Sequence, residues 1–114
     1  MDLIRRQKLV CEQYGSRYCE SPSFFKIGIS FLNVKDRLYT ISGLRHPSKD
    51  DVTGWYIWVG DYSSDSNFFL PVHVEHLNDL CPEILKFLGL APGWRFLVAP
   101  NYEDVWEDIT LLNV

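Results

Sequence analysis

The chain has 114 residues and a formal net charge of −4, with 46% hydrophobic, 15% aromatic and 23% charged residues. This length fits one domain, and the composition is typical of globular proteins and excludes an intrinsically disordered chain. No apolar run approaches the roughly 20 residues that a membrane-spanning helix needs, and no apolar stretch of signal-peptide length follows the basic residues near the N-terminus. We therefore expect a single domain over residues 1–114, located in the cytoplasm.

The first half of the chain predicts one helix and two strands. Residues 2–14 place apolar side chains at helical spacing, and Gly15 is expected to end this helix. Residues 24–32 alternate between apolar side chains and small or polar ones, which predicts a strand. A short strand is expected over Leu38–Ile41, and the turn-forming residues that follow predict a loop over Ser42–Thr53.

The second half predicts a central strand, two short helices and a hairpin. Trp55–Val59 contains only aromatic and β-branched residues, and its two apolar faces indicate a strand covered on both sides. Short helices are expected over Val72–Leu80 and Glu83–Leu88. Trp94–Ala99 alternates as a strand does, and Tyr102–Trp106 is expected to return as an edge strand whose carboxylates oppose self-pairing. This order predicts an α+β fold, with a small, mainly antiparallel sheet on which the N-terminal helix and the two short helices pack.

Charge is divided unevenly between the two halves. Residues 1–49 hold nine Lys/Arg and four Asp/Glu, a net +5, whereas residues 50–114 hold two Lys/Arg and eleven Asp/Glu, a net −9. The split can reflect solvated faces alone, or the second half can form an acidic surface that attracts a basic partner. A direct nucleic-acid binder would be expected to carry the opposite overall sign, so we expect no nucleic-acid partner and no membrane partner.

The number and spacing of the three cysteines indicate a protein of a reducing compartment. Cys11, Cys19 and Cys81 are odd in number and include no Cys-x-x-Cys pair. This pattern is typical of reduced thiols in a cytosolic protein and not of a disulfide framework.

One histidine pair is the only candidate for a metal site. His73 and His76 lie three residues apart, so on a helix both rings would share one side, and with Glu75 or His46 they could ligate zinc. Two histidines supply only half of a structural site, and the alternative is that one ring packs while the other faces water. We therefore predict no bound metal and no cofactor.

Catalytic patterns are absent from the sequence. It contains no Gly-x-Ser-x-Gly, no cysteine in a glycine-framed turn and no glycine-rich phosphate loop. Pairs of acidic residues could be drawn as a general acid and a general base, but nothing in the sequence brings two of them together. We expect a protein that is not an enzyme.

The aromatic residues offer two kinds of binding surface. The four tryptophans are Trp55, Trp58, Trp94 and Trp106. Core packing is the default for each ring, and an exposed ring would be a binding anchor. Trp106 is the strongest candidate because it lies among carboxylates in residues 102–108. Alternatively, Trp55, Tyr56, Trp58 and Trp94 could line the pocket of a small-molecule or carbohydrate-binding module.

Three phrases of the sequence together resemble a known family. They are Gly-Trp-Tyr-Ile-Trp-Val-Gly at 54–60, Pro-Val-His-Val-Glu-His-Leu at 71–77, and Leu-Gly-Leu-Ala-Pro-Gly-Trp-Arg-Phe-Leu at 88–97 running on to Tyr-Glu-Asp-Val-Trp at 102–106. Over roughly residues 24–114 the chain resembles the immunity protein 33-like group of small bacterial immunity proteins. The resemblance implies a non-enzymatic cytoplasmic antidote, which binds a cognate toxin domain of a bacterial competition system and blocks its active site or a surface that it needs.

The resemblance transfers no residue-level site, so the expected contact surface comes from the acidic second half. Many toxin domains are nucleases, which are basic because they bind phosphates, and an acidic antidote would associate with them quickly. The sequence does not give the oligomeric state. The expected contact residues are Asp61, Asp65, Tyr102, Glu103, Asp104, Trp106, Glu107 and Asp108.

Overall fold

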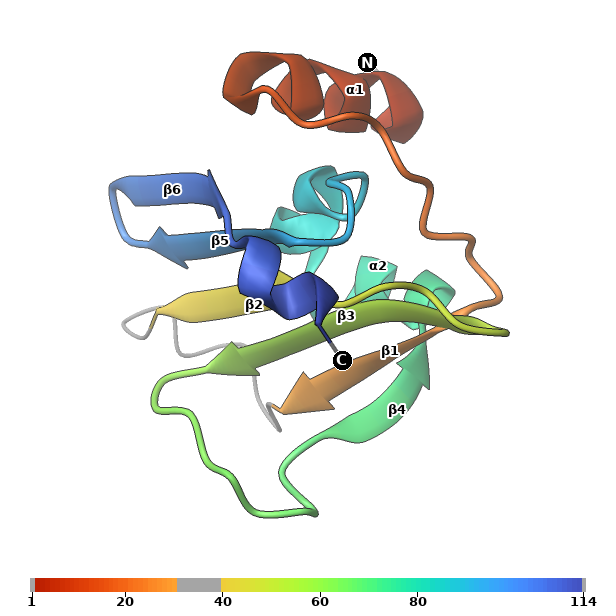
Figure 1. Cartoon of the computed structure of the whole chain (residues 1–114), viewed down its shortest axis with the longest axis vertical. Helices are drawn as coiled ribbons and strands as arrows, with labels where there is room; N and C mark the ends of the chain where they lie inside the picture. The colour runs from red at the N-terminus through yellow and green to blue at the C-terminus, as the bar shows by residue number, and fades with distance from the viewer. Residues whose placement is uncertain (1, 31–39, 114) are drawn as a thin grey trace.

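A six-stranded sheet is the centre of the computed structural model, which describes residues 2–30 and 40–113 (Figure 1). The strands lie in the order β4-β1-β3-β2-β5-β6, and neighbours are antiparallel except β1 and β3, which run parallel. The strands are β1 (Lys26–Ser30), β2 (Ile41–Arg45), β3 (Val52–Val59), β4 (Leu70–His73), β5 (Trp94–Ala99) and β6 (Tyr102–Glu107). The predicted α+β class with a mainly antiparallel sheet is confirmed.

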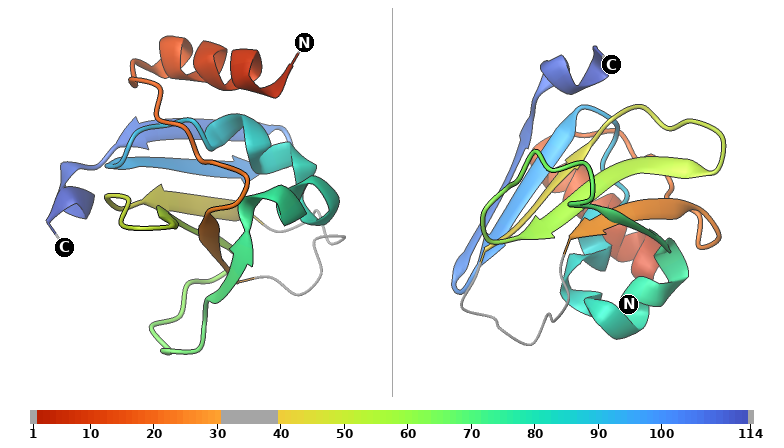
Figure 2. Two further views of the ribbon diagram at one scale, coloured as in Figure 1. Left: turned by 90° about the vertical axis from the view of Figure 1, so that its right-hand side faces the viewer. Right: turned by 90° about the horizontal axis from the view of Figure 1, so that it is seen from below.

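The helices are short except for the first. They are α1 (Leu3–Tyr14), the 3-10 helix η1 (Val74–His76), α2 (Leu77–Leu80), and the 3-10 helices η2 (Pro82–Phe87) and η3 (Ile109–Leu112). The helices α2 and η2 cover one face of the sheet, α1 packs against η2, and η3 lies on the other side (Figure 2). Within the described ranges, no helix is long and apolar enough to cross a membrane.

The first helix begins and ends at the expected residues. Asp2 accepts a hydrogen bond from the backbone N–H of Arg5 at 2.8 Å and so caps the N-terminus. Gly15 ends the helix in the left-handed conformation, with φ of 89°. The helix buries Val10 and Cys11 together with Gln7, whose side chain donates a hydrogen bond of 2.8 Å to the carbonyl of Leu85 in η2.

The core fills the space between the sheet and the helices. Trp55 and Ile57 of β3 and Phe96 of β5 are fully buried on the helix side. Phe87 of η2 stacks on Phe96, with ring centroids 4.5 Å apart and ring planes 10° apart. The predicted central position of β3 and the predicted strands β5 and β6 are confirmed.

Strand β2 corrects the predicted loop over Ser42–Thr53. Ser42 and Gly43 are typical turn formers, but here they pair with β3 on one side and β5 on the other. A Cβ atom on Gly43 would lie 2.2 Å from Cε2 of Phe96, so the glycine permits close packing and does not make a turn. The expected strand Leu38–Ile41 falls outside the described residues apart from Thr40 and Ile41.

The predicted helix Val72–Leu80 is also wrong in its first part. Residues 70–73 form β4, which pairs with β1 at the edge of the sheet, and η1 and α2 follow it. Pro71 has no N–H to donate, which an edge strand tolerates. The second expected short helix is confirmed as η2, with Pro82 in its first turn.

Candidate functional site

The face of the sheet away from α2 and η2 forms a broad surface, which we call the open face. Strand alternation directs Tyr56 of β3, Leu44 of β2, Arg95 of β5 and Trp106 of β6 to this side, because their neighbours along each strand are buried in the core. The register places these four residues opposite one another in a single row across the sheet. A parallel row contains Trp58, Ser42, Leu97 and Asp104.

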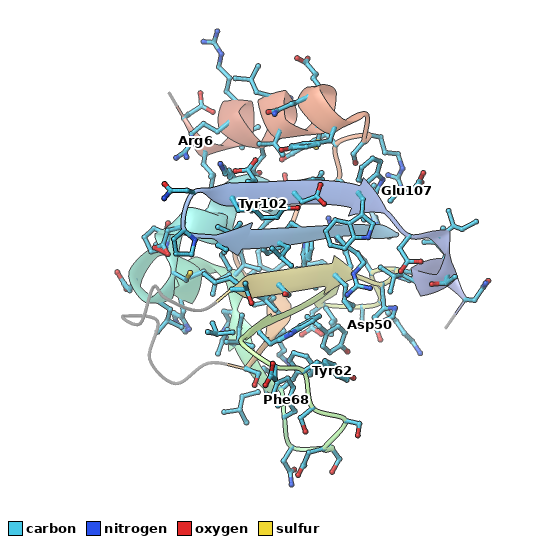
Figure 3. The ribbon with its side chains drawn as sticks, turned by 90° about the vertical axis from the view of Figure 1, so that its left-hand side faces the viewer. Arg6, Asp50, Tyr62, Phe68, Tyr102 and Glu107 are labelled. Atoms are coloured by element: carbon cyan, nitrogen blue, oxygen red, sulfur yellow. The ribbon has the colours of Figure 1, made fainter. Side chains whose placement is uncertain are left out.

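An aromatic cluster covers the β3 end of the open face. The loop after β3 brings Tyr62, Phe68 and Phe69 onto Tyr56 and Trp58, and Figure 3 shows Tyr62 and Phe68 below the exposed strands. Ring centroids lie 5.1 Å apart for Tyr56 and Phe69 and 5.3 Å apart for Trp58 and Tyr62, in edge-to-face geometry. Trp58 is therefore only 6% exposed, whereas Tyr62 is 59% exposed.

A groove of about 750 Å³ lies beside this cluster. Its lining joins the rings of Tyr56, Tyr62 and Phe69 to the carboxylates of Asp50 and Asp51. These two aspartates form the turn between β2 and β3, which is closed by hydrogen bonds between the backbones of Lys49 and Val52. The groove therefore combines aromatic walls with an acidic rim.

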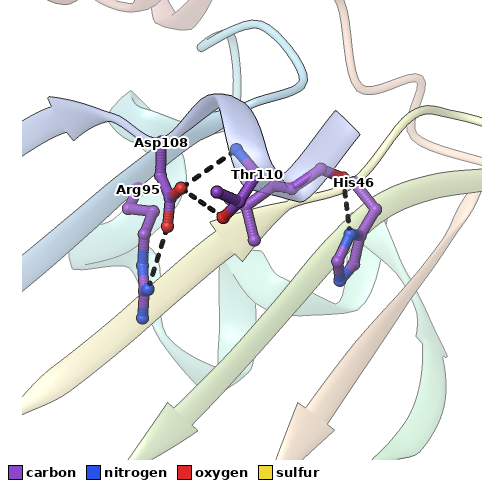
Figure 4. Close-up of polar contacts among 5 residues, drawn as sticks. His46, Arg95, Asp108 and Thr110 are labelled. Atoms are coloured by element: carbon purple, nitrogen blue, oxygen red, sulfur yellow. Dashed lines mark hydrogen bonds and ion pairs between the residues drawn. The ribbon is translucent and has the colours of Figure 1, made fainter. Parts of the chain in front are cut away.

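The β6 end of the open face is organised by Arg95. Its guanidinium lies 5.5 Å from the ring centroid of Trp106. It also lies 3.5 Å from the Asp108 carboxylate, as Figure 4 shows. Asp108 in turn caps η3, because it accepts hydrogen bonds from the backbone N–H of Thr110 at 3.1 Å and from the Thr110 hydroxyl. The Thr110 hydroxyl is the main cause that holds the pKa of Asp108 below its usual value, and Arg95 adds to it. The Asp108 carboxylate is therefore already engaged inside the protein, by Arg95 and by Thr110.

Helix η3 is also held to the turn beside the groove. His46 Nδ1 lies 2.9 Å from the carbonyl oxygen of Leu111 (Figure 4), and the carbonyl can only accept, so Nδ1 carries the proton. The His46 ring packs edge-to-face on Tyr56 with centroids 5.7 Å apart. The C-terminal helix and the aromatic cluster are therefore linked through one imidazole.

Glu103 points to the other face of β6. Its carboxylate accepts hydrogen bonds from Lys86 Nζ at 2.7 Å and from the Tyr14 hydroxyl at 2.9 Å. Burial alone would raise the pKa of Glu103, but these two hydrogen bonds outweigh it and the pKa is lowered. Burial, followed by the nearby Glu103 carboxylate, raises the pKa of Tyr14. Glu103 therefore fastens the edge strand to η2 and α1.

A comparison with protein-family models identifies the family of the chain. The model described as the Imm33-like domain matches residues 6–108. The chain belongs to the Imm33-like family. The matched range contains all six strands described above and most of α1, and it confirms the resemblance seen in the sequence. A search of curated proteins and a search of solved structures each found no match.

In the Imm33-like domain, the expected contact residues lie on both faces of the sheet. Trp106 and Asp104 lie on the open face, whereas Glu103 does not. Glu107 is paired with Trp94, whose ring is in the core, so it also lies on the helix side of β6. Trp106 is half-buried beneath Arg95 and is not a free anchor. The remaining expected contact residues are Asp61, Asp65 and Tyr102, which are exposed, and Asp108, which is half-buried.

The histidine pair is not placed as the sequence predicted. In the Imm33-like domain His73 is the last residue of β4 and His76 the last residue of η1, so they do not share a helix. Their ring centroids still lie 5.7 Å apart, and His76 Nε2 lies 4.0 Å from Glu75 Oε1. His46 is engaged by Leu111. Within residues 2–30 and 40–113 there is no group of three or more His, Cys, Asp or Glu residues that could hold a metal ion.

The four-residue aromatic pocket is also corrected. Trp55 is fully buried and Trp94 is 9% exposed, and both belong to the core of the Imm33-like domain. Of the four rings, only Tyr56 lines the groove. Tyr62, Phe69 and the acidic rim at Asp50 were not predicted from the sequence. The available signal was the adjacent pair Phe68 and Phe69 after a polar loop, because two large apolar residues there need a surface to cover.

Proposed function

We propose that this Imm33-like chain is an immunity protein, which binds a cognate bacterial toxin domain in the cytoplasm and neutralises it without catalysis of its own. Family membership over residues 6–108 is the observation that carries this proposal. In this proposal the protein acts by covering the toxin's active site or a surface that the toxin needs.

The open face supports this proposal as the surface that meets the toxin. The opposite face is covered by α2 and η2, so in the part of the chain that the structure describes the open-face side of β2, β5 and β6 is the side left for a partner. Asp104 and Tyr102 are exposed on β6, and Asp61 and Asp65 are exposed on the loop after β3. Arg95, which lies between them, is paired with Asp108. Exposed carboxylates around half-buried rings suit a basic partner.

Co-expression with a candidate cognate toxin domain tests the proposal. Wild-type protein is expected to restore growth, and Asp104→Lys combined with Asp61→Lys is expected to reduce protection, because both changes place a cation opposite a basic surface. Asp79 is an exposed residue of α2. Asp79→Lys is therefore the matched control and is expected to protect fully. Trp106→Ala is a further variant, used with a thermal unfolding measurement because Trp106 packs on Arg95.

Two outcomes count against the proposal in different ways. If wild-type protein does not protect, the immunity function is wrong. If the wild type protects and all folded open-face variants protect equally well, the function stands and the surface is wrong.

A second candidate, binding of a small molecule or a carbohydrate, is favoured by the groove beside the aromatic cluster. Its volume of about 750 Å³ is in the range of small-ligand sites. A protein with this function would gain thermal stability from a member of a ligand panel and would give no protection against the toxin.

A further inference from the structure

The groove on the open face is rich in hydrogen-bond acceptors. Asp50 and Asp51 contribute carboxylates, which only accept. His46 uses Nδ1–H to bond Leu111, so the tautomer that makes this bond with a single ring proton presents Nε2 as an acceptor. Lys49 is the one cationic side chain among the described residues that line the groove. The lining is therefore better suited to a ligand that donates than to one that accepts.

The acidic rim is not neutralised evenly. Asp51 forms an ion pair with Lys26 at 3.4 Å. Asp50 forms no ion pair with any residue that the structure describes, and it is exposed. Its φ of 52° lies in the left-handed region, and the backbone hydrogen bonds between Lys49 and Val52 hold the turn in place. The turn therefore places one carboxylate at the rim that is not paired with a cation of the described residues.

Aromatic rings lie within reach of the same space. Tyr62 and Asp50 both line the groove, and Figure 3 labels both of them below β2. Tyr62 is packed against Trp58 and Phe68, so its ring is supported from behind although it is largely exposed. Rings attract a cation placed over their faces, and a planar guanidinium also stacks on them.

We propose that this groove receives an arginine side chain of the toxin domain, with the guanidinium against the aromatic walls and paired with Asp50. The inference rests on the proposed immunity function and names the chemistry of its anchor. Arginine fits better than lysine because its planar fork carries five donors, which match an acceptor-rich groove with flat walls. The acidic rim, the aromatic lining and the expected basic partner all favour the same occupant.

The test measures toxin binding by two groove variants and their matched controls. Tyr62→Ala removes a ring of the groove, and Phe24→Ala removes a more exposed ring, 67% exposed, outside the groove. Asp50→Asn removes the charge and keeps a residue that tolerates the left-handed region, and Asp79→Asn removes a charge from α2. We expect Kd to rise about tenfold or more for Tyr62→Ala and several-fold for Asp50→Asn, with changes below about twofold for the controls.

A double-mutant cycle identifies the occupant. Each arginine of the toxin's contact surface is replaced by lysine and by leucine, and binding is measured against wild type and Tyr62→Ala. We expect one toxin arginine whose replacement weakens binding to the wild type but adds little in Tyr62→Ala, a coupling of about tenfold. Its lysine variant is expected to recover only part of the affinity.

The possible results distinguish a failure of the arginine proposal from a failure of the proposed immunity function. Wild-type affinity in both groove variants, or the absence of any toxin arginine that couples to Tyr62, overturns the arginine proposal while immunity stands. Association of two copies of this chain through the groove, measured by sedimentation and lost in Tyr62→Ala, also overturns it. A wild-type chain that binds no toxin overturns the proposed function itself.

Discussion

Arg45 places a permanent charge in the core and surrounds it with carbonyl oxygens. The residue is fully buried, and its guanidinium donates to the carbonyls of Leu90 at 2.7 Å, Cys19 at 2.8 Å and Thr53 at 3.0 Å. It also lies 5.6 Å from the ring centroid of Trp55. The loss of solvent lowers the pKa of Arg45, and the carbonyls compensate by solvating the ion. One side chain therefore joins the segment after α1, the turn before β5 and the start of β3.

Arg45→Met is expected to lower the free energy of unfolding by about 3 kcal/mol or more, because several buried carbonyls lose their donor. Urea unfolding monitored by tryptophan fluorescence measures this loss. Arg6→Met on the exposed side of α1 is the control and is expected to change stability by less than about 0.5 kcal/mol. A loss below about 1 kcal/mol for Arg45→Met would contradict the role assigned to the buried cation.

Glu103 makes stability depend on pH in a direction set by its lowered pKa. A carboxyl whose pKa is lower in the folded state contributes stability above its unfolded pKa, and that contribution is lost as pH falls through the folded value. Glu103→Gln is expected to cost about 0.5–1 kcal/mol at pH 7 and nothing below the folded pKa. Urea unfolding of both proteins between pH 2 and pH 7 measures the difference. A constant difference across this range would contradict the role of the charged carboxylate.

At the scale of elements, the turn between β2 and β3 depends on a glycine that the sequence does not mark as special. Gly54 has φ of 91°, and a Cβ atom there would lie 1.9 Å from the carbonyl oxygen of His46. Gly15 at the end of α1 has a similar φ of 89°, yet nothing lies within 4 Å of its added Cβ. The two glycines share a backbone conformation and differ in available space.

This difference gives a matched pair of substitutions. Gly15→Ala is expected to cost about 1 kcal/mol from backbone strain alone. Gly54→Ala is expected to cost roughly 3 kcal/mol, because a clash with backbone adds to the same strain. Thermal or urea unfolding of the two variants compares them directly, and equal costs would contradict the close approach at Gly54.

The predictability of each element follows from whether its signal is local. Helix α1 has its own cap and stop residue, and β5 alternates regularly, so both are readable from sequence. Strand β2 is not, because Gly43 is explained by the Phe96 ring that lies against it, a contact between distant residues. Likewise the groove arises from two loops, and the charge of Asp108 is committed to Arg95 and η3. The acidic pattern was visible, but which carboxylates remain available was not.

At the scale of the whole molecule, the sheet separates a layer of helices from the open face. The helix layer holds the basic α1 and the internal Lys86–Glu103 pair, whereas Asp61, Asp65 and Asp104 are exposed on or beside the open face. Residues 50–114 carry a net charge of −9 within the overall charge of −4, so the proposed contact surface is expected to attract a basic partner at long range.

Steering predicts an association rate that depends on salt. The rate constant for toxin association is expected to fall about tenfold or more as salt is raised from low to high ionic strength, while the dissociation rate changes little. Stopped-flow or surface-based kinetics over a salt series measures both. A salt-independent association rate would contradict an acidic contact surface.

Hydrogen–deuterium exchange of the chain, alone and saturated with the toxin domain, tests most directly whether the open face binds. We expect slower exchange upon binding in β6, in the turn at Asp50 and in the loop after β3, with little change in α1 and α2. Slower exchange confined to α1, α2 and η2, with the open face unchanged, would contradict this expectation.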